Sequence, residues 1–169
     1  MKTRIIFLLL ILFTLPALAN TPGEVMEGEF LRDATLYGFG GDVQKLSALR
    51  GKPLIINMWA SWCPPCRAEM SSLDQLYQRY GGKQFNLIGI SADDDSNAAF
   101  NFLMQSGITF ANYADHKLIM ENMLGAHTIP LTLLIDANGK VLKKFHGFHE
   151  WDSEETIAMI AKLFETKLQ

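Results

Sequence analysis

Two cysteines separated by two prolines are the residues of this chain best suited to a role in a chemical reaction. Cys63 and Cys66 follow Trp62 and are the only cysteines among the 169 residues. At a helix N-terminus, unpaired backbone N–H groups and the helix dipole favour the reactive thiolate over the thiol. Residues three apart on a helix also lie close enough for a disulfide bond. The pair is therefore typical of thiol–disulfide exchange, with Cys63 as the exposed, attacking thiolate and Cys66 as the buried, resolving thiol.

Other roles for a cysteine pair fit this chain less well. A zinc site needs four ligands, and the chain has no second cysteine pair to complete one. A disulfide that closes so short a loop stabilises little through chain entropy. Copper binding by the thiols is an alternative, but no histidine has helical ligand spacing with the motif. The histidines are His116, His127, His146 and His149. We expect them to be scattered on the surface, with no metal site and no cofactor.

The residues on either side of the pair predict the strand and the helix that must position it. Residues 54–60 form an apolar run whose length and composition are typical of a buried strand. From residue 64 to about 80, apolar side chains recur at helical spacing. Pro64 suits the first turn of this helix, where a missing N–H costs nothing. Residues 85–91 predict a second buried strand, so the order indicates a parallel pair with a right-handed crossover.

The rest of the chain alternates short strands and helices. The expected elements are an N-terminal hairpin over 30–43, a helical turn over 45–49, helices over 96–105 and 115–124, strands over 108–113, 131–135 and 141–145, and a last helix from Asp152. Asn138-Gly139 is a strong hairpin signal, and Glu155 follows Asp152 in a capping-box pattern. The acidic run 93–95 is interpreted as a helix start, because the further ligands of a calcium loop are absent. This order predicts an α/β fold with a central mixed β-sheet flanked by helices, an N-terminal hairpin and a helical insert.

The first residues have the pattern of a secretory signal peptide. Lys2 and Arg4 precede an apolar stretch over residues 5–15, and small residues at 17 and 19 form a cleavage site. The stretch is shorter than the roughly 20 residues that a membrane-spanning helix needs. We therefore expect cleavage after Ala19 and a periplasmic protein. The alternative is an uncleaved N-terminal membrane anchor.

Cleavage divides the chain into a signal peptide at 1–19, a loose leader at 20–29 and one domain at 30–169. The 150 residues that remain are enough for a single domain with its own core, and we expect a monomer. The formal charge changes from −3 to −5, because the signal carries two basic residues and no acidic one. A mildly acidic exported domain lacks the basic surface that nucleic acids require.

The motif and its surroundings resemble the thioredoxin superfamily. The matching residues are Asn57-Met58-Trp59-Ala60-Ser61-Trp62, Cys63-Pro64-Pro65-Cys66, Ile129-Pro130 and Leu133 to Val141. More narrowly, the chain resembles the exported TlpA/ResA-like disulfide reductases, a branch that includes the cytochrome c maturation thioredoxins. The resemblance extends from about residue 46 to the terminal helix. It implies a thioredoxin-like fold and thiol:disulfide oxidoreductase activity without a cofactor.

A glutamate near the cysteines is the next candidate for a role in the reaction. Cytosolic thioredoxins carry a buried aspartate in the strand before the motif, where this chain has Asn57, whereas the TlpA/ResA-like pattern has a glutamate that matches Glu69. Glu69 also lies between Cys66 and Leu73 on the apolar stripe of the expected helix, where burial raises a carboxyl pKa. Such a carboxyl can accept and return the proton of Cys66. The alternative is a glutamate at the edge of the stripe with its carboxylate in water.

Substrate contacts are implied by the resemblance as well. Pro130 matches the proline that is cis in this superfamily and presents the preceding backbone to an extended substrate. Relatives often have a threonine before that proline, where this chain has Ile129, and many have a proline in place of Ser71. Trp59 is expected to pack in the core. The expected substrate-binding residues are Trp62, Pro64, Pro65, Ile129 and Pro130.

The sequence thus predicts a reductant of disulfides in other exported proteins, with apocytochrome c as a candidate client. By resemblance, its electrons come from a membrane thiol-reductant transporter. Pro64 and Pro65 offer neither charge nor a side-chain donor that would make Cys63 as acidic as in a strong oxidant. Two alternatives are a Cu(I)-binding chaperone and a thiol peroxidase of the same fold. A peroxidase needs a threonine and an arginine around its cysteine, and the motif lacks that threonine.

Overall fold

The computed structural model describes residues 23–168. Its elements in chain order are β1 (Thr35–Gly38), β2 (Val43–Lys45), the 3₁₀ helix η1 (Leu46–Leu49), β3 (Leu54–Trp59), α1 (Pro64–Tyr80), β4 (Asn86–Ser91), α2 (Ser96–Ser106), β5 (Ala111–Ala114), α3 (Ile119–Leu124), β6 (Leu131–Ile135), β7 (Val141–His146) and α4 (Glu154–Leu163). The strands form one sheet in the order β2-β1-β5-β4-β3-β6-β7. The β3–β4 and β4–β5 pairs are parallel and the other four are antiparallel. The predicted mixed sheet is confirmed.

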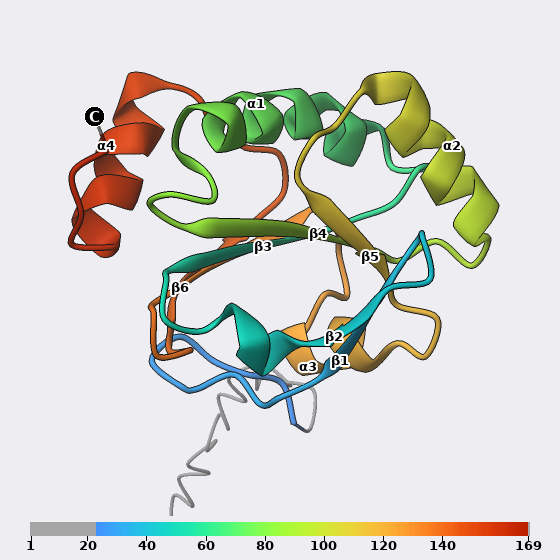
Figure 1. Cartoon of the computed structure of the whole chain (residues 1–169), viewed down its shortest axis with the longest axis horizontal. Coiled ribbons are helices and arrows are strands. Elements are labelled where there is room, and N and C mark those ends of the chain that lie inside the picture. Colours follow the sequence, from blue (N-terminus) through green and yellow to red (C-terminus); the bar gives the residue numbers. More distant parts are fainter. Residues whose placement is uncertain (1–22, 169) are drawn as a thin grey trace, which may run out of the picture.

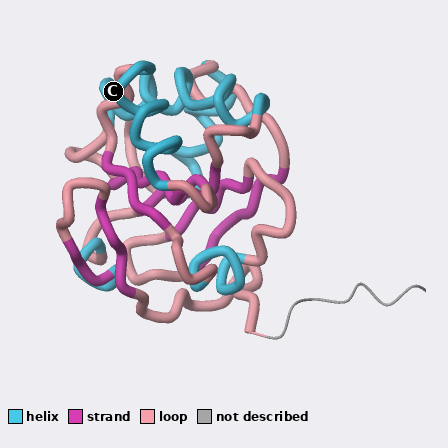
Figure 2. The backbone as a smooth tube through the Cα atoms, turned by 90° about the vertical axis from the view of Figure 1, so that its right-hand side faces the viewer, coloured by secondary structure: helices cyan, strands magenta, loops and turns pink. Residues whose placement is uncertain are grey.

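The sheet separates two apolar cores. Helices α1, α2 and α4 cover one face, and α3 lies on the other with the N-terminal segment (Figure 1). The longer helices gather on one side of the strands when the molecule is turned by 90° (Figure 2). Strand β3 contributes to both cores because successive side chains of a strand point to opposite faces. Ile55 and Trp59 pack with the core under α1, whereas Ile56 and Met58 pack with the core against α3.

Helix α1 begins and ends where the sequence indicates. Pro64 and Pro65 occupy its first turn, and Cys63 is its N-cap residue. Gly81 is its C-cap, and the Gly81 N–H donates to the carbonyl of Tyr77. The helix turns one stripe toward the sheet, formed by Cys66, Glu69, Met70, Leu73, Asp74 and Leu76. Each apolar side chain buried there contributes about 1.5–3 kcal/mol to stability. Packing therefore determines which residues of the helix face the sheet.

Three expected boundaries are displaced in the structure. Helix α3 begins at Ile119, not near residue 115, because Leu118 adopts a left-handed conformation with φ 53°. The Asp115 side chain instead accepts from the N–H groups of Ile119 and Glu121. Strand β5 starts later than expected, at Ala111. The N-cap of α4 is Ser153, not the predicted residue one position earlier, and its Oγ accepts from the N–H of Thr156.

The described part of the expected leader, from Gly23, is not loose. The side chain of Val25 is buried, and its N–H donates to the carbonyl of Met123. A nearly buried ion pair joins Lys144 of β7 to Glu24, with Nζ and Oε1 2.5 Å apart. These contacts hold the segment on the face of the sheet that carries α3. Within residues 23–168 no helix combines the length and the apolar character needed to cross a membrane.

Candidate active site

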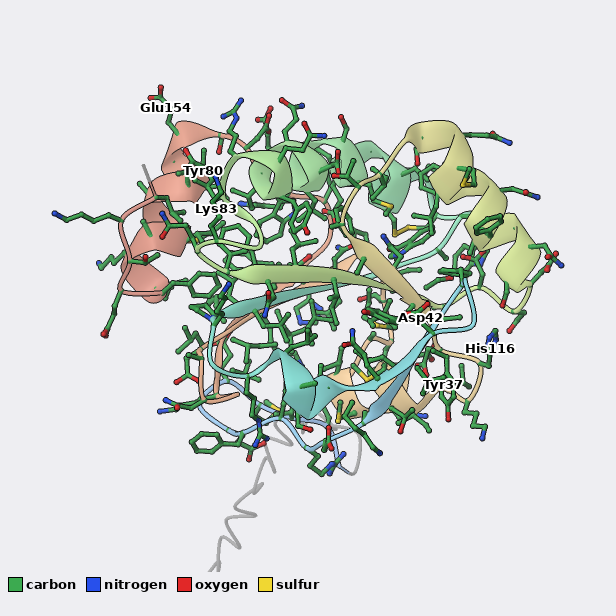
Figure 3. The ribbon with its side chains drawn as sticks, in the orientation of Figure 1. Tyr37, Asp42, Tyr80, Lys83, His116 and Glu154 are labelled. Atoms are coloured by element: carbon green, nitrogen blue, oxygen red, sulfur yellow. A yellow bond between two sulfur atoms is a disulfide. The ribbon has the colours of Figure 1, made fainter. Side chains whose placement is uncertain are left out.

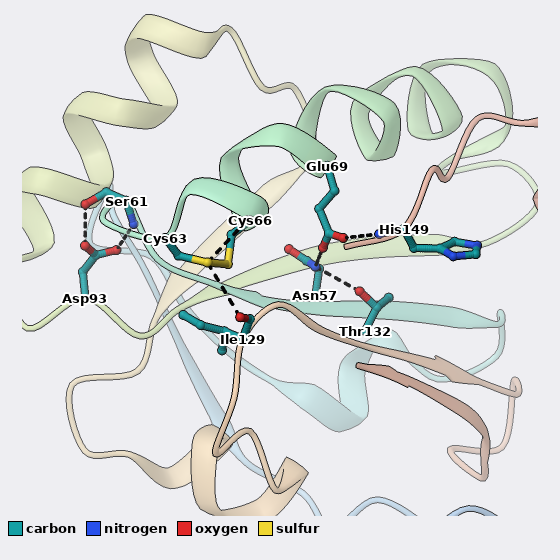
Figure 4. Close-up of a disulfide and its surroundings, with 9 residues drawn as sticks. All are labelled: Asn57, Ser61, Cys63, Cys66, Glu69, Asp93, Ile129, Thr132 and His149. Atoms are coloured by element: carbon teal, nitrogen blue, oxygen red, sulfur yellow. Dashed lines mark hydrogen bonds between the residues drawn. A yellow bond between two sulfur atoms is a disulfide. The ribbon is translucent and has the colours of Figure 1, made fainter. Parts of the chain in front are cut away.

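The two cysteines form a disulfide at the N-terminus of α1. Their Cα atoms are 5.3 Å apart, and the Cys66 N–H points to Cys63 Sγ at an N–S distance of 3.3 Å (Figure 4). Cys63 is 4% exposed and Cys66 is 0% exposed. Cys63 is the more accessible of the two, but it is buried in this disulfide form and not exposed as predicted. The buried strand β3 and the helix α1 place both sulfurs beyond the carboxyl end of β3.

A buried carboxylate holds the loop that leads from β3 to Cys63. Asp93 accepts hydrogen bonds from the Ser61 N–H at 2.9 Å, the Ser61 hydroxyl at 2.5 Å and the Ser91 hydroxyl at 2.8 Å. The loop is thereby tied to the end of β4 (Figure 4). The sequence placed Asp93 only at a helix start, where Asp95 is in fact the N-cap of α2. Ser61 and Asp93 are far apart in the sequence, so no local pattern could have paired them.

Glu69 is fully buried, as the apolar stripe predicted. Burial raises its pKa from the ordinary value of 4.5 to about 7, because a charged carboxylate is poorly solvated there. The N–H of His149 and the side-chain amide of Asn57 act in the opposite direction, because their hydrogen bonds favour the anion. A group that changes charge near neutral pH is suited to proton transfer.

Asn57 and Thr132 complete the surroundings of this carboxyl. Asn57 Nδ2 donates to Glu69 Oε1 at 2.7 Å and to Thr132 Oγ1 at 3.0 Å. Asn57 and Thr132 are directly opposed in the β3–β6 pair, and both side chains are buried. The sequence drew attention to Asn57 through the aspartate that it replaces, whereas Thr132 had no signal beyond its place in an expected strand.

The loop between β7 and α4 supplies a contact that the sequence did not reveal. The backbone N–H of His149 donates to Glu69 Oε2 at 3.0 Å (Figure 4). The His149 ring is half-buried between Phe145 and Trp151, and its Nε2 pairs with Thr156 Oγ1 at 3.0 Å. The expectation of surface histidines is therefore wrong for His149. Its ring packs against Phe145 and Trp151, while its backbone N–H donates to the Glu69 carboxylate.

The backbone expected to dock substrate lies beside the disulfide. The Ile129–Pro130 peptide bond is cis, and the carbonyl oxygen of Ile129 lies 3.8 Å from Cys63 Sγ. Pro130 is buried, whereas Ile129 is half-buried. Trp62 is 66% exposed next to the disulfide. The Trp62 ring, the Cys63 sulfur and a backbone segment therefore border the same surface, which also carries the exposed residues Pro64 and Pro65.

The other histidines do not gather at the disulfide. His116 lies with Tyr37 and Asp42 beside the β1–β2 hairpin (Figure 3). Across residues 23–168, no group of three or more histidine, cysteine, aspartate or glutamate side chains is arranged to hold a metal ion. Trp59 is fully buried as predicted, and its indole N–H donates to Asn112 Oδ1 at 2.9 Å.

Comparisons with known proteins agree with this geometry. The Redoxin family model matches residues 26–160. The chain is 31% identical over 150 residues to the thiol-disulfide oxidoreductase ResA of Geobacillus thermodenitrificans, with 87% of this chain and 86% of the relative covered. It is 34% identical over 103 residues to ResA of Bacillus thuringiensis, with 61% of this chain covered but only 60% of that relative. Across this second match, the chain spans less than two thirds of its relative's length.

A solved structure shows the same architecture. The chain superposes on a Chlorobium tepidum protein, provisionally named thiol:disulfide interchange protein DsbE, with a TM-score of 0.75 and 32% identity. The match covers 83% of this chain and 99% of that protein. The Cys63–Cys66 disulfide, the cis proline beside it and the two sequence matches lead to one assignment. The chain belongs to the Redoxin family and, within it, to the ResA-like thiol-disulfide oxidoreductases.

Proposed function

We propose that this chain is a periplasmic reductant of disulfides in exported proteins, with apocytochrome c as a client. The observation that carries the proposal is the Cys63–Cys66 disulfide at the N-terminus of α1, with the fully buried carboxyl of Glu69 on the same helix face. A client with a C-x-x-C-H haem-attachment motif offers a disulfide of matching size. No cofactor is needed, since the two thiols supply both electrons. The proposed oligomeric state is a monomer.

In the first step, the Cys63 thiolate attacks one sulfur of the substrate disulfide. A bond forms between Cys63 Sγ and that sulfur, the substrate S–S bond breaks, and the other substrate sulfur leaves as a thiolate that takes a proton from water. Trp62 and the Ile129 backbone border the site of attack. They are the proposed docking surface for the substrate chain, together with Pro64, Pro65 and Pro130.

In the second step, Cys66 resolves the mixed disulfide. The Glu69 carboxylate takes the proton of the Cys66 thiol, and the resulting thiolate attacks Cys63 Sγ. The Cys63–Cys66 bond forms, and the substrate leaves as a thiolate that takes up one proton. Glu69 passes the Cys66 proton to the leaving substrate thiolate as the bond between Cys63 Sγ and the substrate sulfur breaks. Counted from the dithiol form, whose Cys63 gave its proton to water when the thiolate formed, the protein has lost two electrons and two protons and the substrate has gained the same number. Glu69, whose pKa is about 7, can both accept and release that proton at neutral pH.

The direction of electron flow follows from what surrounds Cys63. Strong oxidants of this fold stabilise a very acidic attacking thiol, whereas Pro64 and Pro65 place no charged or donating side chain between the cysteines. The protein then needs a source of electrons, for which we propose a membrane thiol-reductant transporter. The periplasmic location is supported by the signal-peptide pattern of residues 1–19. That segment and the alternative membrane anchor lie outside the described residues.

Trapping of the mixed disulfide tests the proposal. A Cys66→Ser variant expressed in the periplasm should accumulate covalent complexes with exported proteins, because the second step has no nucleophile. A Cys63→Ser variant is the matched control and should accumulate none. Oxidised apocytochrome c should be reduced by the dithiol form of the native chain. Complexes in both variants or in neither, or tight Cu(I) binding by a protein that exchanges no disulfides, would contradict the proposal.

A further inference from the structure

Both oxygens of the Glu69 carboxyl accept hydrogen bonds. Oε1 accepts from Asn57 Nδ2, and Oε2 accepts from the His149 N–H. A proton on either oxygen therefore points at a donor and finds no acceptor. Because leaving a buried polar group unpaired is costly, the protonated form requires one of these partners to change.

The two hydrogen-bonding partners of Glu69 differ in whether they can accept a hydrogen bond as well as donate one. The N–H of His149 belongs to the backbone and can only donate. The amide of Asn57 carries both a donor and an acceptor, and its Oδ1 is buried without a hydrogen-bond partner among residues 23–168. Half a turn of this amide would exchange the positions of Oδ1 and Nδ2. It would bring an acceptor to the place from which Nδ2 now reaches Glu69.

Thr132 makes both orientations of the amide compatible with the site. Its Oγ1 now accepts from Asn57 Nδ2 at 3.0 Å. A hydroxyl is both donor and acceptor and rotates freely, so it can donate to Oδ1 after the turn. One end of the amide pairs with Glu69 and Thr132 in each orientation, and the other end stays unpaired. Which of the two orientations has the lower free energy then depends on whether Glu69 is protonated.

We propose that Asn57 and Thr132 are positioning residues for the proton that Glu69 carries. Asn57 donates to the carboxylate and, after half a turn of its amide, accepts from the carboxylic acid, while Thr132 reverses its hydroxyl. This inference rests on the proposed role of Glu69 in resolution. Each protonation state is thereby hydrogen-bonded, which keeps the exchange of the proton feasible at neutral pH.

Other titratable groups near the cluster are few. On α1 the two cysteines do not titrate in the disulfide form, and on β3 and β6 Asn57 and Thr132 carry no charge. The loop after β7 contributes the ring of His149, which contacts Trp151, and the exposed carboxylate of Glu150. Because the ring of His149 belongs to the same cluster, a test must separate an effect of Glu69 from one of His149.

NMR of the oxidised protein provides that test. The Glu69 carboxyl carbon is followed from pH 5 to 9, together with the NOEs from the Asn57 side-chain amide protons to Thr132 and to the neighbours of Glu69. We expect these NOEs to be present at high pH and lost at low pH. The midpoint of this change should coincide with the midpoint of the Glu69 titration. In Glu69→Gln they should not depend on pH. A titrating Glu69 with unchanged Asn57 NOEs, or a pH dependence that persists in Glu69→Gln, would overturn the inference.

Variants at the two positioning residues give a second measurement. Asn57→Leu removes donor and acceptor together, so the anion loses a charge-assisted bond and the acid a weaker neutral one. The midpoint of the Glu69 titration should therefore rise by about one pH unit. Thr132→Ser retains the hydroxyl and should preserve the wild-type NOE change. An unchanged midpoint in Asn57→Leu, or loss of the NOE change in a folded Thr132→Ser, would count against the inference.

The inference and the proposed function fail in different ways. If Glu69→Gln resolves mixed disulfides as fast as the wild type, Glu69 is not the proton carrier, whatever the amide does. If resolution slows in Glu69→Gln but the Asn57 amide never turns, the function stands and the positioning role does not.

Discussion

The carbonyl oxygen of Ile129 lies 3.8 Å from the sulfur of Cys63, on the side away from the helix that donates to that sulfur. The Cys66 N–H, 3.3 Å from the same sulfur, stabilises a thiolate. A carbonyl oxygen has the opposite effect, because it accepts from a thiol and repels a negative charge. The Ile129 carbonyl therefore limits how acidic the Cys66 N–H can make Cys63 after reduction.

Alkylation of the reduced protein should distinguish the two thiols. We expect iodoacetamide at pH 7 to label Cys63 more than about tenfold faster than Cys66, because Cys63 lies at the helix N-terminus and is the less buried sulfur. Peptide mass spectrometry over a time course measures both rates. Equal rates, or faster labelling of Cys66, would exchange the two roles.

The reduction potential should be that of a reductant. With Pro64 and Pro65 between the cysteines and the Ile129 carbonyl beside Cys63, we expect the pKa of the Cys63 thiol to stay well above that of the attacking thiol of a strong oxidant. The potential should then lie nearer about −270 mV than about −120 mV. A glutathione or dithiothreitol redox titration gives the potential, and thiolate absorbance against pH gives the pKa. A potential close to about −120 mV would make the protein an oxidase.

The local part of the site was predictable because it depends on neighbours in the sequence. The apolar run of β3, the N-terminal position of Cys63 and the stripe that buries Glu69 all follow from periodicity and helix geometry. The cis bond before Pro130 was implied by the resemblance and is present. These features determine which residues react.

The partners of Glu69 were not predictable in the same way. Asn57 of β3 and the His149 N–H of the loop after β7 donate to the carboxyl, and Thr132 of β6 holds Asn57. The pairing of Asn57 with Thr132 depends on the register of two antiparallel strands, for which the sequence offers no local signal. The displaced start of α3 has a local cause instead, since the Asp115 side chain replaces the turn expected there.

The buried carboxyl should make stability depend on pH. In the folded protein the pKa of Glu69 is about 7, above its ordinary value of 4.5. Between these values the folded protein keeps a proton that the unfolded chain has lost, so the stabilisation is complete below pH 4.5 and is lost as pH rises through 7. The free energy of unfolding should fall by about 3 kcal/mol from this cause.

The Glu69→Gln variant is the reference for that effect, because its side chain does not titrate. Denaturant unfolding of both oxidised proteins at pH 5, 6, 7 and 8 should show the wild type losing stability relative to the variant as pH rises. Parallel curves for the two proteins would show that Glu69 has an ordinary pKa in the folded state.

Asp93 should stabilise the loop before Cys63. Its carboxylate pairs with the Ser61 N–H and with the hydroxyls of Ser61 and Ser91, so Asp93→Ala leaves buried donors without an acceptor. We expect the free energy of unfolding to fall by about 1–3 kcal/mol. The matched control is Asp94→Ala, at the exposed neighbouring position, which should change it by less than about 0.5 kcal/mol. Asp93→Asn should give an intermediate loss, because an amide has one oxygen to accept with where the carboxylate has two. If Asp93→Ala were as stable as Asp94→Ala in denaturant unfolding, these hydrogen bonds would not be what fixes the loop in place.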